Sequence, residues 1–251
     1  MKKIIVDGNK LRAINIVGIE DYLLSVISSE MSATASEEFL KAHAVISRSW
    51  VMAQIASARQ HKSGTVPDGV CNVPTLMTDL DSRLNFDDTI NAEHTHSYTI
   101  WYDHDDHHSF DVCADDHCQR YQGLTRATGN TVRKVIDTTW GQVLTYGGEL
   151  CDARFSKCCG GRMESFSTCW DDKDYDYLVP LPDAPGHQEG QKCFCDTDDK
   201  EILSQVLNNY DQETVDFYRW KTEYGRNELA GLIERKRGLK IGRIISLEAL
   251  E

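Results

Sequence analysis

Between residues 107 and 121 the chain carries two cysteines and three histidines, and this stretch constrains the local fold more than any other feature of the sequence. Thiolates and imidazoles are the ligands of closed tetrahedral zinc sites, so the stretch predicts a metal centre. The expected ligands are His107, Cys113, His117 and Cys118, with His108 as the substitute for His107. An ion with four protein ligands has no open coordination position, so the predicted zinc is structural.

The ligand spacing differs from that of zinc fingers, so the prediction rests on ligand chemistry alone. His117 and Cys118 are adjacent, and adjacent side chains of a strand point to opposite faces. Both can bind one ion only where the backbone turns, and Asp115 and Asp116 are suitable turn residues. Two alternatives stay open, namely a histidine-bearing surface loop without metal and a disulfide between Cys113 and Cys118.

Composition limits the classes of partner. The hydrophobic share of 40% and the charged share of 27% are ordinary for a soluble globular protein. A net charge of -13 argues against a nucleic-acid partner, which requires a basic surface. No apolar run is long enough for a membrane span, and no export signal follows Met1.

The chain has nine cysteines, which indicates an oxidising compartment if those outside the metal centre form disulfides. Cys158 and Cys159 could be a reactive pair, but we expect them to contribute to a structural disulfide. The candidate partners for that disulfide are Cys169, Cys193 and Cys195.

The hydrophobic pattern predicts an α+β fold of mixed helices and antiparallel strands with long loops, in a single domain over residues 1–251. Thr34 and Glu37 form a capping-box pattern ahead of a helix whose apolar positions run from Phe39 past Ala56. Residues 61–90 are expected to be a loop insertion or flap. The other expected elements are a strand over 3–17, helices over 20–31, 132–137, 202–207 and 228–234, a hairpin over 143–155, and strands over 215–220 and 241–247.

Three groups of residues outside the metal stretch are candidates for chemistry. Glu30 lies between two predicted helices, where partial desolvation can suit a carboxyl group to proton transfer, although a solvated role is the ordinary outcome. Lys41 and Arg48 lie two helical turns apart, so they share a face that could bind an anion or be merely solvated. The glycine-rich segment with Ser156, Gly160 and Gly161 could approach a sugar closely.

Taken in order, several segments resemble the SpoIID/LytB family, which includes the stage II sporulation protein D and amidase enhancers. The ordered series is far more specific than any single piece, and it includes Ser29-Glu30-Met31 and the run from His117 to Gly123. The matching segments are residues 17–23, 29–31, 38–49, 111–113, 117–123, 138–146, 155–156 and 160–161, with Trp170 completing the set. Family members usually carry Gln where this chain has His43, and both ends of the chain look cut relative to the family.

The resemblance implies a lytic transglycosylase that cleaves peptidoglycan glycan strands lacking stem peptides and forms 1,6-anhydro products. Glu30 would be the catalytic acid and base, and some members bind zinc through the His/Cys cluster. Expected substrate contacts are Lys41, Arg48, Gln119, Tyr121, Ser156, Gly160 and Gly161. The expected location is extracytoplasmic, in the periplasm, envelope or medium, with the export segment absent from this sequence.

Two other functions stay open. The enhancer branch implies a non-catalytic protein that binds the cell wall and stimulates an N-acetylmuramoyl-L-alanine amidase, in which case Glu30 is incidental. Zinc-dependent hydrolysis at the His/Cys cluster is the third hypothesis, and it predicts activity that a chelator abolishes.

Overall fold

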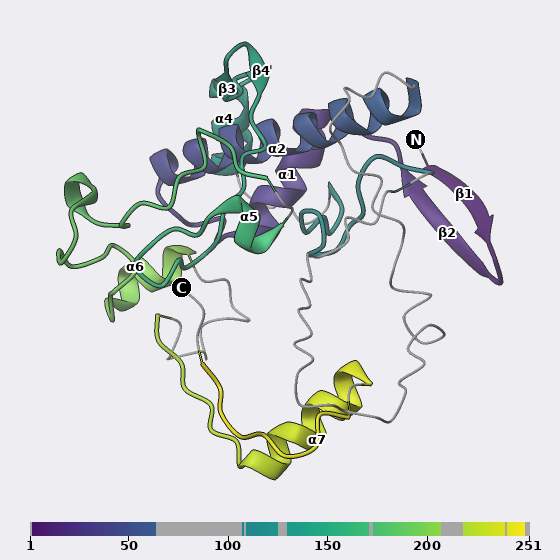
Figure 1. Ribbon diagram of the computed structural model, residues 1–251. Helices are drawn as coiled ribbons and strands as arrows, with labels where there is room; N and C mark the ends of the chain where they lie inside the picture. Colours follow the sequence, from purple (N-terminus) through teal and green to yellow (C-terminus); the bar gives the residue numbers. More distant parts are fainter. Residues whose placement is uncertain are drawn as a thin grey trace. The chain divides into compact units, whose positions relative to one another are not determined.

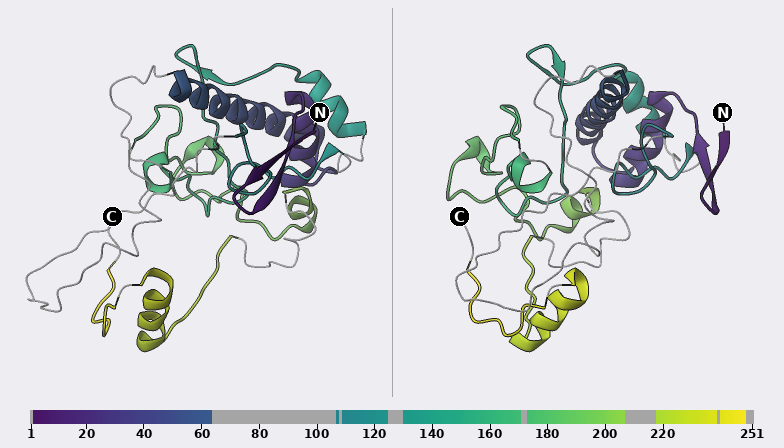
Figure 2. Two further views of the ribbon diagram at one scale, coloured as in Figure 1. Left: turned by 90° about the vertical axis from the view of Figure 1, so that its right-hand side faces the viewer. Right: turned by 45° about the vertical axis from the view of Figure 1, so that its right-hand side comes forward.

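The computed structural model describes residues 2–63, 107, 109–124, 130–170, 173–206, 218–238 and 240–248. The chain divides into two compact units, one formed by residues 1–70 and 101–218 and the other by residues 71–100 and 219–251. Figure 1 and Figure 2 show the helices and short strands of the described residues. These elements confirm the α+β fold class, whereas most of the expected 61–90 insertion lies outside the described residues.

Three helices form the core of the first unit: α1 (Ile19–Glu30), α2 (Glu37–Ser63) and α4 (Asn130–Thr138). Each contacts the other two, as Figure 1 shows. The apolar side chains between them are almost fully buried, and burial of each valine, leucine or isoleucine is worth about 1.5–3 kcal/mol. They include Leu23, Val26, Ile27, Leu40, Ala44, Val51, Val132 and Val135.

The long helix α2 confirms the helix predicted past Ala56, but its start and its buried face differ from the prediction. The Ser36 hydroxyl accepts the Phe39 N–H at 3.4 Å, while Thr34 bonds to the Ser32 hydroxyl. The capping box at Thr34 is therefore wrong, because a serine nearer the helix takes its place.

The buried stripe of α2 includes polar residues that hydrophobic periodicity passes over. Ser47 and Arg48 are completely buried, whereas Ala42 is exposed. The most buried face therefore lies between the apolar positions that the pattern identified.

Two antiparallel hairpins supply the named strands. β1 (Lys2–Asp7) pairs with β2 (Lys10–Asn15), so the single strand predicted over 3–17 is wrong. Gly8, with φ of 59°, makes the turn that splits it. β3 (Thr145–Tyr146) pairs with β4 (Glu149–Leu150) around Gly147 and Gly148, both with positive φ, as predicted.

Beyond residue 150 the first unit contains α5 (Phe166–Cys169), the short 3-10 helix η2 (Pro185–His187) and α6 (Lys200–Val206). The second unit contains α7 (Arg226–Arg237). α6 and α7 confirm the predicted helices over 202–207 and 228–234.

The strands predicted over 241–247 and 215–220 are not found in the described residues. The strand predicted over 241–247 is wrong, because these residues pair with no strand among those described and Gly242 has a positive φ of 64°. The strand predicted over 215–220 lies partly outside the described residues, and its described part is not a strand.

None of the helices in the described part of the chain has the length and apolar character that a membrane crossing requires.

Candidate functional site

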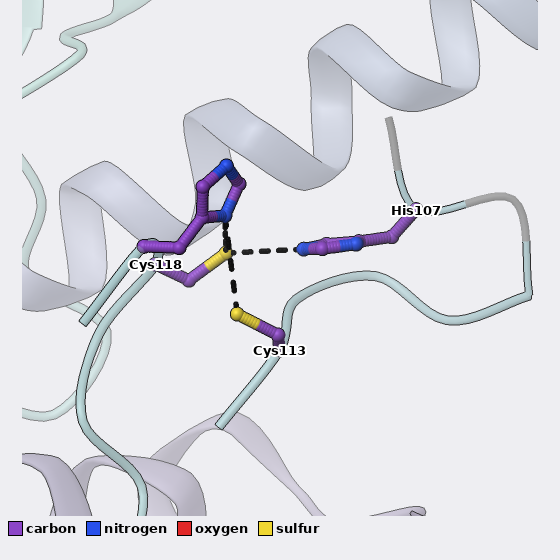
Figure 3. A group of neighbouring side chains, drawn as sticks. His107, Cys113 and Cys118 are labelled. Carbon is purple, nitrogen blue, oxygen red and sulfur yellow. Dashed lines mark hydrogen bonds between the residues drawn. The ribbon is translucent and has the colours of Figure 1, made fainter. Parts of the chain in front are cut away.

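The four predicted metal ligands converge in the structure. His107, Cys113, His117 and Cys118 offer ligand atoms that all lie within 4.8 Å of one another. Figure 3 shows the Cys118 sulfur between His107 and Cys113. His108, the substitute ligand, lies outside the described residues.

The distances within this His/Cys cluster match a tetrahedral zinc site. Cys118 Sγ lies 3.4 Å from His107 Nε2 and 3.6 Å from His117 Nδ1, and Cys113 Sγ lies 3.9 Å from His117 Nδ1. Zinc bonds of about 2.3 Å to sulfur and about 2.0 Å to nitrogen at tetrahedral angles separate the two ligand atoms by roughly 3.5 Å. The donor set therefore fits a closed zinc centre.

Local backbone structure explains how adjacent residues reach one point. The Cys118 N–H donates to Asp115 O and the Tyr121 N–H donates to Ala114 O, both at 3.0 Å, so the chain turns sharply around His117. Arg120 holds the Asp116 carboxylate through Nε and a terminal nitrogen, at 2.7 and 2.6 Å, across the same turn. The turn expected at Asp115 and Asp116 is thus present.

The residues following Cys118 attach this loop to the helical core. Tyr121 stacks on Tyr22 of α1, with ring centroids 5.5 Å apart. The Gln122 N–H donates to the Ser25 hydroxyl at 2.9 Å, and the Gln119 side chain is buried against Tyr22. The loop after the His/Cys cluster is therefore fixed on α1.

Glu30 is the last residue of α1, and it lies half-buried under this loop. Its Oε1 accepts the backbone N–H of Arg120 at 2.7 Å. No salt bridge to Glu30 occurs among the described residues, so the carboxyl group is anchored by an amide and not neutralised by a cation. Such a group keeps one oxygen for contact with a ligand.

Burial affects the ionisable groups between Glu30 and the cluster. Desolvation raises the pKa of Cys118 to about 12 in the absence of a metal. Burial, reinforced by the nearby Cys118 and Glu30, raises the pKa of Tyr22 far above its usual value. The Tyr22 hydroxyl is therefore a stable neutral donor that lies near both the cluster and the carboxyl group.

Lys41 and Arg48, predicted to share an anion-binding face, have different surroundings. Arg48 is fully buried and donates to both carboxylate oxygens of Glu20, at 2.9 and 2.6 Å, and to Gln142 O. Lys41 bonds to Glu37 and Glu38 at the surface of α2. The structure does not bring the pair together around a ligand, because the Arg48 guanidinium is committed to the core.

The other predicted substrate contacts are only partly accessible. Gln119 is 2% exposed, Tyr121 is half-buried with its hydroxyl bonded to Asn15, and Ser156 is exposed. Gly160 and Gly161 both have positive φ.

Gly161 is needed for a close approach within the protein. A Cβ on Gly161 would meet Cys193 Sγ at 2.9 Å and the Tyr218 hydroxyl at 3.0 Å. The glycine therefore accommodates these two side chains, a reason that its sequence context did not reveal.

None of the described cysteines forms a disulfide, so the disulfide expected from the Cys158–Cys159 pair is absent from the described residues. Cys159 Sγ lies 3.7 Å from Cys195 Sγ, well beyond a bond of about 2.0 Å.

Sequence reasoning missed the backbone N–H of Arg120 as the group that positions Glu30, since a main-chain donor leaves no signature in residue type. It also missed Tyr22, whose place in an apolar helical run reads as core.

A shallow pocket lies at the other end of α1 from Glu30 and is not the site described above. Its lining residues are Gly18, Ile19, Glu20, Asp21, Leu24, Arg133, Ile136, Asp137 and Trp140.

Comparison with known proteins divides the chain into two parts. The family model described as Stage II sporulation protein (SpoIID) matches residues 7–79 and 88–146, more than half of the chain, and this range includes Glu30 and the His/Cys cluster. A second model, described as a domain of unknown function (DUF8618), matches residues 164–251. No curated protein and no solved structure matches the chain.

Proposed function

The chain belongs to the Stage II sporulation protein family, SpoIID, whose role concerns the cell wall, and on that basis we propose that it is a lytic transglycosylase acting on peptidoglycan glycan strands. The proposed substrate is strands from which stem peptides have been removed. Peptidoglycan is the expected partner, so the site of action is the extracytoplasmic cell wall.

The observation that carries the proposal is the environment of Glu30. The carboxyl group is half-buried at the end of α1, is oriented by the Arg120 N–H at 2.7 Å, and forms no salt bridge among the described residues. A catalytic acid needs a fixed position and an oxygen that no cation neutralises. Glu30 meets both requirements, and none of the other glutamates of α1 and the start of α2 does so, because Glu20, Glu37 and Glu38 are ion-paired.

One carboxyl group suffices for the proposed reaction. Glu30 donates its proton to the glycosidic oxygen as the bond to the anomeric carbon breaks. The ionised Glu30 then accepts the proton of the sugar's own 6-hydroxyl as that oxygen attacks the anomeric carbon, which closes the 1,6-anhydro ring and restores the acid. No water is consumed, so the second carboxylate of ordinary glycosidases is unnecessary.

Zinc is proposed as a structural ion held by His107, Cys113, His117 and Cys118. When bound it supplies a crosslink within the loop, because four protein ligands leave no position for substrate. The amide that orients Glu30 lies close to the last ligand in the sequence, since Arg120 is two positions after Cys118. Loss of the crosslink should displace the amide that orients Glu30.

The test is digestion of denuded glycan strands, followed by mass analysis for 1,6-anhydro ends. Glu30→Gln keeps the size of the side chain and its acceptor oxygen but removes the proton that is transferred, so turnover should fall by roughly 10²–10⁴-fold. Glu38→Gln is the matched control, because Glu38 is an exposed α2 residue paired with Lys41, and it should retain wild-type turnover.

The outcomes separate the remaining hypotheses. A wild-type protein that releases no anhydro ends but stimulates a cell-wall amidase would be the non-catalytic enhancer. Products that carry reducing ends, formed by Glu30→Gln and lost with chelator, would indicate zinc-dependent hydrolysis. Either result would refute the transglycosylase proposal.

A further inference from the structure

A second cluster of metal-ligating side chains lies outside the site described above. Cys159, Asp183 and Cys195 offer ligand atoms within 4.8 Å of one another. All three side chains are half-buried. We infer that this second cluster binds a second zinc ion, one that joins three segments of the first unit.

The distances between the ligand atoms support an ion at this place. Cys159 Sγ lies 3.7 Å from Cys195 Sγ and 3.3 Å from Asp183 Oδ2. Two thiolates on a tetrahedral zinc are separated by about 3.8 Å, and a thiolate and a carboxylate oxygen by roughly 3.6 Å. The sulfur atoms are therefore at the separation of shared ligands and not at that of a disulfide.

The backbone holds the ligands together independently of their side chains. The Asp183 N–H donates to Gly161 O at 3.0 Å, and the Phe194 N–H donates to Asp183 O at 2.9 Å. The first bond ties the Cys159 loop to the Asp183 loop, and the second ties Asp183 to the segment of Cys195. The second cluster is thus built on three anchored segments.

The chemistry of the donors favours zinc over harder cations. Two thiolates prefer a soft or borderline ion, and one carboxylate is compatible with zinc. Among the described residues no salt bridge engages Asp183, so no protein cation occupies the place of the ion. Cys193 is not one of the converging ligands among the described residues, since its sulfur lies 3.3 Å from Gly161 O and donates there.

The location suggests what the ion does. Cys159 lies between the two ranges that the family models match, whereas Asp183 and Cys195 lie within the range of the second model. An ion shared by these residues would fasten the C-terminal part of the first unit to the polypeptide that leaves the β3–β4 hairpin. The inference does not depend on the proposed transglycosylase activity.

Zinc analysis of the full chain tests the inference. The protein is stripped of metal under reducing conditions, loaded with zinc, dialysed and assayed for bound zinc per chain. Wild type should retain two equivalents, Cys118→Ser one, Cys195→Ser one, and the double variant none. Cys169→Ser is the control, because Cys169 is a half-buried thiol outside both clusters, and it should retain two.

Asp183→Asn provides a second test that does not depend on a cysteine. The amide has nearly the same shape as the carboxylate, so the fold should persist while zinc affinity at the second cluster falls by at least about tenfold. Cobalt substitution in Cys118→Ser should give sulfur-to-cobalt charge-transfer absorption that disappears when Cys195→Ser is added.

Two results would overturn the inference. One is a single zinc equivalent in wild type that Cys118→Ser removes entirely. The other is mass analysis of the unreduced chain that finds Cys159 and Cys195 joined as a disulfide, with the stripped and reduced protein still taking up no second ion.

Discussion

His43 carries the sharpest prediction about stability, because its buried ring has no hydrogen-bond partner among the described residues. The side chain is 5% exposed, and neither ring nitrogen bonds to any described residue. Its ring packs edge-on against Phe155, with centroids 5.1 Å apart. Burial lowers the pKa of His43 from 6.5 to about 4, because a charged imidazolium would be desolvated there.

The sign of the effect follows from proton linkage. As the pH falls through 6.5 the unfolded chain gains a proton at His43, whereas the folded chain does so only near pH 4. The stabilisation from the neutral ring is complete above pH 6.5 and is lost as the pH falls from there to about 4. The full loss is about 3 kcal/mol, and roughly 2 kcal/mol of it is reached by about pH 5.

Comparison of wild type with His43→Gln isolates this contribution, because glutamine does not titrate while all other groups are shared. Urea unfolding of both proteins at about pH 7 and about pH 5 gives the two changes in unfolding free energy. Wild type should lose roughly 2 kcal/mol more than the variant. Equal losses in the two proteins would show that His43 is hydrated or paired, and the reasoning from burial would fail.

Three further predictions concern the fold and the loop that carries the predicted zinc ligands. Arg48→Met should lower the free energy of unfolding by about 3–5 kcal/mol in urea unfolding, because it leaves Glu20 buried and unpaired. The surface variant Lys41→Met should lower it by less than about 1 kcal/mol. An equally small loss in Arg48→Met would contradict a structural role for Arg48. Gly161→Ala should lower the unfolding free energy by more than about 1 kcal/mol and lower the melting temperature with it, because a φ of 108° disfavours a side chain and the new Cβ meets a sulfur at 2.9 Å. An unchanged melting temperature would refute this. Cys118→Ala should reduce zinc content and increase proteolytic cleavage within the loop after residue 118, and a loop as resistant as that of wild type would contradict metal-dependent order.

The sequence predicted the cores of the helices well but not the contacts between segments. Leu23, Val26 and Ile27 repeat at helical spacing, so their burial followed from periodicity. Periodicity could not identify Arg48 as a core residue, because only its long-range pairing with Glu20 makes burial of its charge tolerable. The strand predicted over 241–247 failed for a related reason, since a strand is stabilised by a partner that its own residues do not specify.

The candidate site was predictable where chemistry constrains residue type. Thiol and imidazole side chains in a short loop have few uses other than metal binding, and His107 and Cys113 do converge with the other predicted ligands. The disulfide expected from the Cys158–Cys159 pair is wrong, and spacing could not have decided it, because cysteine pairing depends on which loops meet in space. Gly161 shows the same limit, as its requirement for a glycine comes from Cys193 of a distant segment.

The bond from the Arg120 amide to Glu30 has a consequence for how this site tolerates variation. Every amino acid except proline supplies that N–H, so exchanging the guanidinium for another side chain leaves the donor in place. The position of this donor therefore depends on the path of the backbone through the loop and not on the side chain at position 120. A screen of point variants at position 120 should identify proline as the damaging substitution.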